Sequence, residues 1–93
     1  MAILSFKCKL TRGMFEGVRA RRFANIETVA MRKLAMLNRA ANPDDLRIPP
    51  NNQLEALKGD RAGQRSIRIN RQWRVCFIWT ASGPTEVEIV DYH

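Results

Sequence analysis

The last three residues of the chain, Asp91, Tyr92 and His93, combine groups that can move a proton near neutral pH. His93 is the only histidine, and an imidazole with an ordinary pKa of about 6.5 can act as an acid or a base. Tyr92 could stack on a base or orient a phosphate, and Asp91 could orient the imidazole or accept a proton itself. These groups suit metal-independent cleavage of RNA, which needs an activated 2′-hydroxyl, a protonated leaving oxygen and a stabilised phosphate. The alternative is that a strand ends here and its last residues fray.

Basic side chains in the second half of the chain could supply the phosphate contacts. The candidates are Lys58, Arg68 and Arg74, and the two arginines fall in successive predicted strands, where cross-strand neighbours lie close together. Their alternative role is to cover a solvated sheet face. Gln72 could read an adenine edge through its amide, or it could be an ordinary exposed turn residue.

A second basic segment contains Arg19, Arg21 and Arg22, in a predicted connection with no acidic partner nearby. Arg21 and Arg22 are therefore predicted to contact RNA phosphates. Trp73 could stack on a base, but a tryptophan beside an apolar strand more often belongs to the core.

The distribution of charge favours a polyanionic partner. The 93 residues carry a formal net charge of +7, from 16 Lys and Arg against 9 Asp and Glu. The whole excess lies before Asn42, because nine basic and two acidic residues precede it and seven of each follow. A basic surface of this kind indicates nucleic-acid binding, unless it serves solubility alone.

The composition is that of one small domain over residues 1–93. It is 45% hydrophobic and 27% charged, and its longest apolar run, 75–79, is far shorter than the roughly 20 residues of a membrane span. We therefore expect a soluble, cytoplasmic protein without a signal peptide. Cys8 and Cys76 are expected to be free thiols. Two isolated cysteines and one histidine do not make a zinc site, so no metal or other cofactor is expected.

The pattern of apolar residues predicts an α+β fold. Alternation predicts an opening strand at 3–6 and three further strands near 66–70, 74–79 and 87–92. Two helices are predicted before them, one over 10–15 that stops at Gly17 and one from an Asn25 N-cap to about residue 41. An extended loop is expected over 44–52 and a turn over 59–63. The order β-α-α-β-β-β predicts an antiparallel sheet with both N-terminal helices on one face.

Four segments of the second half carry a family resemblance. They are Leu57 to Gly63 (LKGDRAG), Ser66 to Asn70 (SIRIN), Gln72 to Phe77 (QWRVCF) and Val87 to His93 (VEIVDYH). With these segments the chain resembles the HigB toxins of the RelE superfamily over nearly its whole length. The resemblance implies a RelE-like fold and the toxin of a type II toxin-antitoxin system, a ribosome-dependent endoribonuclease that cuts translated mRNA. It also implies a neighbouring helix-turn-helix antitoxin, HigA-like, that holds the toxin inactive.

The resemblance assigns roles to individual residues. Asp91, Tyr92 and His93 fall on the family's catalytic terminus, and Lys58 and Arg74 fall on positions that can contact the RNA.

Three positions depart from the family pattern, and one of them bears on catalysis. Glu55 stands where characterised members can carry a catalytic histidine, and a glutamate can act as a base but is not a cation at neutral pH. Gln64 and Arg65 stand where aromatic residues often occur, so basicity rises and stacking capacity falls.

Three functions therefore remain open from the sequence. The first is the mRNA-cleaving toxin. The second is a non-catalytic inhibitor of the same fold that blocks a macromolecular target such as DNA gyrase. The third is a plain RNA-binding protein, which would bind RNA or ribosomes with strong salt dependence and leave both intact.

Overall fold

The structure is a computed structural model that describes residues 2–91, so Met1, Tyr92 and His93 lie outside the described residues. The described chain folds into two helices followed by four strands, with short 3-10 turns between them. The strands form one antiparallel sheet in the order β1-β2-β3-β4. The expected α+β class is confirmed. The elements are α1 (Lys9–Phe15), α2 (Glu27–Arg39), β1 (Glu55–Ala56), β2 (Arg65–Arg68), β3 (Trp73–Thr80) and β4 (Gly83–Asp91).

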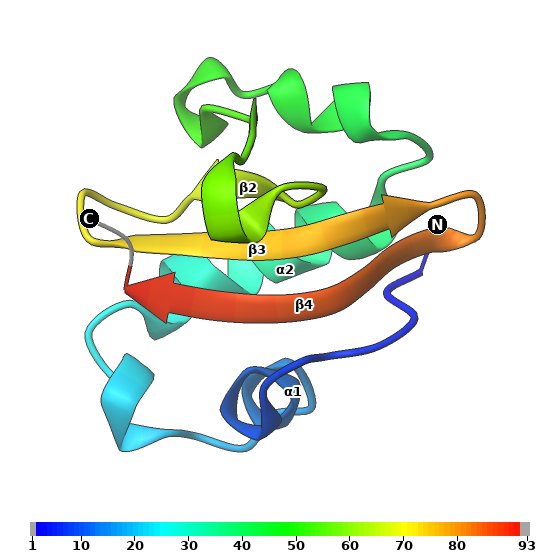
Figure 1. Ribbon diagram of the computed structural model, residues 1–93. Helices are drawn as coiled ribbons and strands as arrows, with labels where there is room; N and C mark the ends of the chain where they lie inside the picture. The colour runs from blue at the N-terminus through cyan, green and yellow to red at the C-terminus, as the bar shows by residue number, and fades with distance from the viewer. Residues whose placement is uncertain (1, 92–93) are drawn as a thin grey trace.

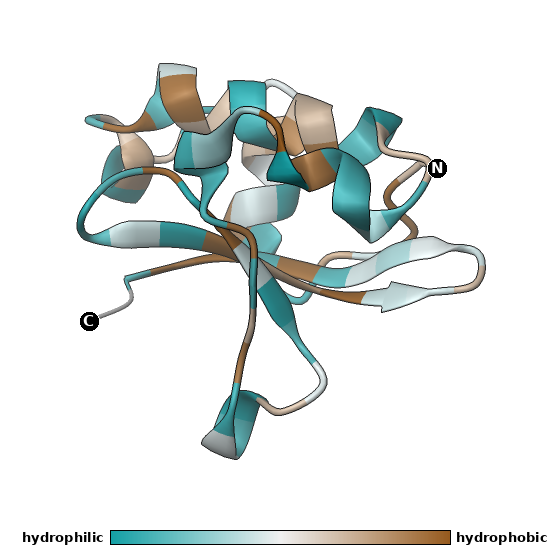
Figure 2. Cartoon of the chain, turned by 90° about the horizontal axis from the view of Figure 1, so that it is seen from above, coloured by the Kyte–Doolittle hydropathy of each residue, from teal (hydrophilic) through white to brown (hydrophobic). Residues whose placement is uncertain are grey.

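Both helices lie on one face of the sheet, and α2 runs behind β3 and β4 in Figure 1. The strands turn every second side chain toward the helices, because successive residues of a strand point to opposite faces. The view from above shows the helices on one side of the sheet and the turn after β1 projecting on the other (Figure 2). The fully buried core residues shared between the sheet and α2 are Ile67, Val75, Phe77, Val87, Ala30, Leu34 and Leu37.

The predicted helices are confirmed with shifted ends. Gly17 follows α1 with a φ of 94°, a backbone conformation that suits glycine. The N-cap prediction for α2 is wrong, because Ile26 and not Asn25 precedes the first helical residue. Ile26 is buried, its N–H donates to the Phe23 carbonyl at 3.0 Å, and its carbonyl accepts from Ala30 at 2.8 Å. Burial of the Ile26 side chain therefore sets where the helix begins.

The opening strand predicted over 3–6 is reduced to a single parallel bridge between Phe6 and Val87. Around this bridge Val87 donates to the Ser5 carbonyl at 3.1 Å, and Lys7 donates to the Val87 carbonyl at 3.0 Å. The N–H of Ile3 turns instead to the side chain of Asn38 in α2, at 3.0 Å. The N-terminal segment thus covers part of the β4 edge without extending the sheet.

The loop expected to be extended over 44–52 contains two 3-10 helices, Pro43–Arg47 and Pro50–Asn52. Proline at the start of each presets φ for a helical turn. The segment is tied to α2 by buried polar groups, because Lys33 donates to Asn52 Oδ1 and Asn52 Nδ2 donates to the Leu46 carbonyl at 3.1 Å. Desolvation, with a smaller contribution from the neighbouring Arg32, lowers the pKa of Lys33.

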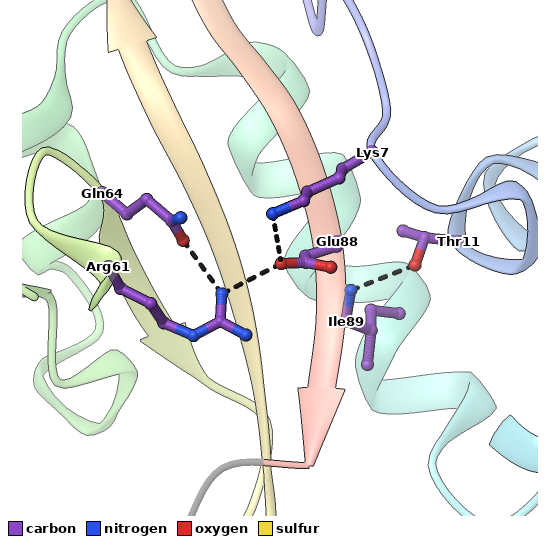
Figure 3. A network of polar contacts seen from close by, with 6 residues as sticks. All are labelled: Lys7, Thr11, Arg61, Gln64, Glu88 and Ile89. Atoms are coloured by element: carbon purple, nitrogen blue, oxygen red, sulfur yellow. Dashed lines mark hydrogen bonds and ion pairs between the residues drawn. The ribbon is translucent and has the colours of Figure 1, made fainter.

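A side chain closes the edge of β4 beyond the bridge. The hydroxyl of Thr11 in α1 accepts a hydrogen bond from the backbone N–H of Ile89 at 3.0 Å, and Thr11 is fully buried (Figure 3). A buried backbone N–H needs such a partner. This bond fixes α1 against the final strand.

Replacing Thr11 by valine keeps its shape and removes this acceptor. We expect Thr11→Val to lower the free energy of unfolding by about 1–3 kcal/mol, because the Ile89 N–H is left buried and unpaired. Urea unfolding followed by circular dichroism measures the change. The control is Thr28→Val, at an exposed position of α2, where threonine and valine have similar helix propensity. Equal stabilities of the two variants would contradict the assigned role.

Candidate functional site

Charged and polar side chains gather on the sheet face turned away from the helices, which we call the open face. The register places Glu55, Ser66, Cys76 and Glu88 in one row across the four strands. Arg68 of β2 pairs directly with Arg74 of β3 in the next row, so the expected cross-strand proximity of these arginines is confirmed. Paired residues share a face, and alternation sends their apolar neighbours to the core.

Arg74 is the most constrained cation of the open face. Its Nε donates to Ser66 Oγ at 2.7 Å, and its Nη2 donates to the Gln53 carbonyl at 2.7 Å. The same Nη2 lies 3.5 Å from Glu55 Oε1. The Arg74 side chain is 11% exposed and that of Glu55 is 50% exposed. The guanidinium is thus held by three segments of the chain, and the carboxylate beside it is open to solvent.

A second polar network lies beside this one, around Glu88 of β4 (Figure 3). Arg61 Nη1 donates to Glu88 Oε1 at 2.9 Å and to Gln64 Oε1 at 3.1 Å. Lys7 Nζ reaches the same Glu88 oxygen from the other side, at 3.8 Å. Arg61 belongs to the turn after β1, which also carries the exposed Lys58. The network therefore fastens this turn to the sheet.

Cys76 lies between the two networks, fully buried in the middle of β3. Burial raises the pKa of its thiol to about 11, and the surrounding charges of Arg61, Glu88, Arg74 and Glu55 contribute smaller and opposing effects. Both cysteines are free, and Cys8 is partly exposed. The Cys76 thiol is therefore buried beneath the open face and uncharged at neutral pH.

Asp91 lies on the other side of the sheet. It pairs with Trp73, which is buried on the helix side and packs edge-to-face on Phe23 with ring centroids 5.7 Å apart. Its Oδ2 accepts a hydrogen bond from Gln72 Nε2 at 2.9 Å. Two predicted site residues, Asp91 and Gln72, are therefore hydrogen-bonded to each other. Asp91 does not share the face of the sheet that carries Arg74.

The basic segment before α2 lies near this strand end. Arg22 stacks over the Trp73 ring with its guanidinium carbon 5.4 Å from the ring centroid, and Arg21 is exposed in the same 3-10 turn. Trp73 is buried at 9% exposure, so its position favours the core role over stacking on a base. The expectation that Arg19 lacks an acidic partner is wrong, because α2 brings Glu27 to 3.3 Å from it.

A cavity of about 340 Å³ lies at the edge of β4. It is lined by Arg61 and Glu88 from the open face and by Arg22 and Asp91 from the helix side. The chain continues from Asp91 to Tyr92 and His93, which lie outside the described residues. The other lining residues are Cys8, Leu10, Phe23, Ile89 and Val90.

Sequence reasoning missed the network of Lys7, Arg61 and Glu88. Arg61 belongs to the quoted turn motif and Glu88 alternates with the buried Val87 and Ile89, so both were visible as outward-facing charges. Their pairing was not visible, because 27 residues separate them. Among residues 2–91, no three His, Cys, Asp or Glu side chains are grouped so that they could hold a metal ion. No helix in that range is long and apolar enough to cross a membrane.

Comparisons with known proteins agree on one class. The family model described as the RelE-like toxin of type II toxin-antitoxin system HigB matches residues 4–93. Toxin HigB-1 of Vibrio cholerae is 41% identical over 78 residues, which cover 82% of each chain. An uncharacterized protein of Haemophilus influenzae is 41% identical over 54 residues, 58% of this chain and 54% of that protein. The YoeB/ParE toxin from Agrobacterium tumefaciens matches in structure over 100% of both chains, with a TM-score of 0.59 and 21% identity, which bears on the fold alone.

Two helices packed on one face of a four-stranded antiparallel sheet match a RelE-like toxin fold. Within that class the family match is specific. The chain belongs to the HigB-like toxins of type II toxin-antitoxin systems, and it therefore has a cognate antitoxin as a partner.

The buried thiol of Cys76 makes the stability of the fold depend on pH above neutrality. Its pKa is about 11 in the folded chain against an ordinary 9.0, so the unfolded chain loses this proton first as pH rises. We expect the thiol's contribution to be complete below pH 9 and to be lost between pH 9 and about 11, by roughly 2–3 kcal/mol.

Urea unfolding of the wild type and Cys76→Ala between pH 7.5 and 11, under reducing conditions, isolates this dependence. The difference in unfolding free energy between the two proteins should shrink as pH rises through that window. Cys8→Ala, at a partly exposed position, should follow the wild type at every pH. A constant difference between wild type and Cys76→Ala would show that the thiol is not desolvated.

Proposed function

We propose that this HigB-like toxin is a metal-independent, ribosome-dependent endoribonuclease that cleaves translated mRNA in the cytoplasm. Its partners are then the ribosome with its mRNA, and a helix-turn-helix antitoxin of the HigA type. Family membership supports the proposal. The observation that carries it is the Arg74 and Arg68 pair on the open face, with the exposed carboxylate of Glu55 3.5 Å from Arg74.

The open face can stabilise a phosphate during cleavage. Arg74 is already held by Ser66 and the Gln53 carbonyl, so its guanidinium need not reorganise as charge develops on the phosphate. Arg68 lies directly opposite and adds a second cation. Two neighbouring cations repel each other, and a phosphodiester bound beside both of them offsets that repulsion.

Proton transfer falls to the carboxylate and the imidazole. Glu55 accepts the proton of the 2′-hydroxyl, which attacks the adjacent phosphate, and the 2′,3′-cyclic phosphate forms as the 5′-oxygen leaves. His93 donates a proton to that leaving oxygen. Tyr92 stacks on a base or orients the phosphate. The reaction needs an acid, a base and charge stabilisation, and these residues supply all three without a metal.

The remaining predicted residues bind RNA or hold the strand end. Asp91 is bonded to Gln72, so in this proposal it positions the end of β4 that leads to Tyr92 and His93. Lys58, exposed in the turn after β1, contacts the RNA backbone. Arg21 and Arg22 also contact it, and Arg22 lines the cavity at the edge of β4.

Replacing His93 by alanine tests the proposed acid. We expect His93→Ala to reduce cleavage of ribosome-bound mRNA by about a hundredfold or more, the usual contribution of general acid catalysis, with stability unchanged. Purified protein is added to ribosomes programmed with a defined mRNA, and the new 5′ ends are mapped.

This assay, together with measurements of DNA supercoiling by gyrase and of ribosome binding, separates the functions. Cleavage by the wild type that persists in His93→Ala refutes the assignment of His93. Intact mRNA with inhibited DNA supercoiling by gyrase supports the second function. Intact mRNA with tight, salt-sensitive ribosome binding supports a plain RNA-binding protein.

Removing one charge from the open face tests where RNA binds. Arg68→Gln should weaken binding to programmed ribosomes and reduce the slope of log affinity against log salt by about one, because one phosphate contact is lost. The matched control is Arg39→Gln, which removes the same charge from the exposed end of α2 on the helix side. Filter binding over a range of salt concentrations measures both. An equal loss in the two variants would mean that net charge and not the open face determines binding.

A further inference from the structure

The turn between β1 and β2 projects from the sheet on the side away from the helices (Figure 2). Leu57 is buried at its start, but of residues 58–63 only Arg61 is not exposed. The backbone of the turn is closed by hydrogen bonds, including Leu57 N–H to the Gln64 carbonyl at 2.8 Å and Arg61 N–H to the Lys58 carbonyl at 3.2 Å. These bonds define the shape of the turn. They do not fix its position over the sheet.

The hydrogen bond from Arg61 to Glu88 holds the turn in position over the sheet. One Arg61 nitrogen donates both to Gln64, at the end of the turn, and to Glu88 in β4, two strands away across β2 and β3. Figure 3 shows the Arg61 side chain reaching from the turn across β3 to the Glu88 carboxylate. The Glu88 side chain is 15% exposed and that of Arg61 is 31% exposed, so the pair is sheltered from solvent. Sheltered charge-assisted bonds hold geometry better than exposed ones.

A carboxylate at this place works against RNA binding. Glu88 lies on the open face, where it accepts a hydrogen bond from Arg61 and lies 3.8 Å from Lys7. It thereby reduces the positive charge that a phosphate would meet. Electrostatics alone would favour a neutral side chain such as glutamine at position 88. The carboxylate is explained if its bond to Arg61 positions a group that binds RNA.

We propose that Glu88 is a positioning residue for the cleavage reaction: through Arg61 it holds the 58–63 turn, and with it Lys58, in register with the open face. This inference rests on the proposed endoribonuclease function. Lys58 begins the 3-10 helix Gly59–Arg61, and its carbonyl accepts the Arg61 N–H, so a displaced Arg61 carries Lys58 with it. Glu88 itself touches neither RNA nor the reacting atoms.

The test is a double-mutant cycle on single-turnover cleavage of ribosome-bound mRNA. Glu88→Gln should lower the cleavage rate by about tenfold to a hundredfold, the scale of a displacement of about 1 Å. In the Lys58→Ala background, Glu88→Gln should have no further effect, because the residue that it positions is already gone. Arg61→Gln, which cuts the same link from the turn, should give the same loss and the same dependence on Lys58.

The control is Glu86→Gln, which removes an exposed carboxylate from the same strand. It should cleave at least as fast as the wild type, because one repulsive charge is lost. Thermal unfolding of each variant confirms that the rates belong to folded protein.

Three outcomes would overturn the inference. Faster or unchanged cleavage by Glu88→Gln would show that Glu88 affects RNA only through its unfavourable charge. If Glu88→Gln lowers the cleavage rate equally in the wild-type and Lys58→Ala backgrounds, the role of Glu88 is structural. Loss of folding in both Glu88→Gln and Arg61→Gln would likewise make its role structural. A wild type that leaves the mRNA intact under these conditions contradicts the proposed function itself, which separates that failure from a failure of the positioning role.

Discussion

The pairing of β3 with β4 is the constraint on which the rest of the structure depends. Their alternation sends Val75, Phe77, Val87 and Ile89 into the core beneath the helices. The same alternation places Arg74, Cys76 and Glu88 on the open face. A shift of either strand by one residue would exchange the two sets. Core burial and the arrangement of charge on the open face are therefore set together by this pairing, whose register shifts between Cys76 and Ile78.

The sequence predicted the parts of the fold that follow from short-range pattern. The 3.6-residue period of α2, the alternation of Ile67 and Ile69, and the pairing of Arg68 with Arg74 could all be derived from local spacing. The family resemblance, carried by the turn and strand motifs, is confirmed over residues 4–93.

The errors lie where tertiary contacts override local preference. Asn25 is a better N-cap than Ile26 by residue type, but the buried Ile26 side chain sets the helix start. The segment over 43–52 is polar and rich in proline, yet burial of Asn52 against Lys33 holds it close to α2. The pairs of Arg19 with Glu27 and of Arg61 with Glu88 depend on how separate elements meet. None of these contacts has a short-range signal.

The structure divides the predicted site between two sides of one strand. Glu55, Arg68 and Arg74 lie on the open face, whereas Asp91 lies on the helix side with Gln72. The division has a physical reason, since Asp91 pairs with Trp73 and residues so paired share a face. Both sides contribute to the cavity at the edge of β4, which is lined by Arg61 and Glu88 from one side and by Arg22 and Asp91 from the other. The cavity at the edge of β4 therefore brings Asp91 together with Arg61 and Glu88, and leaves Glu55, Arg68 and Arg74 outside its lining.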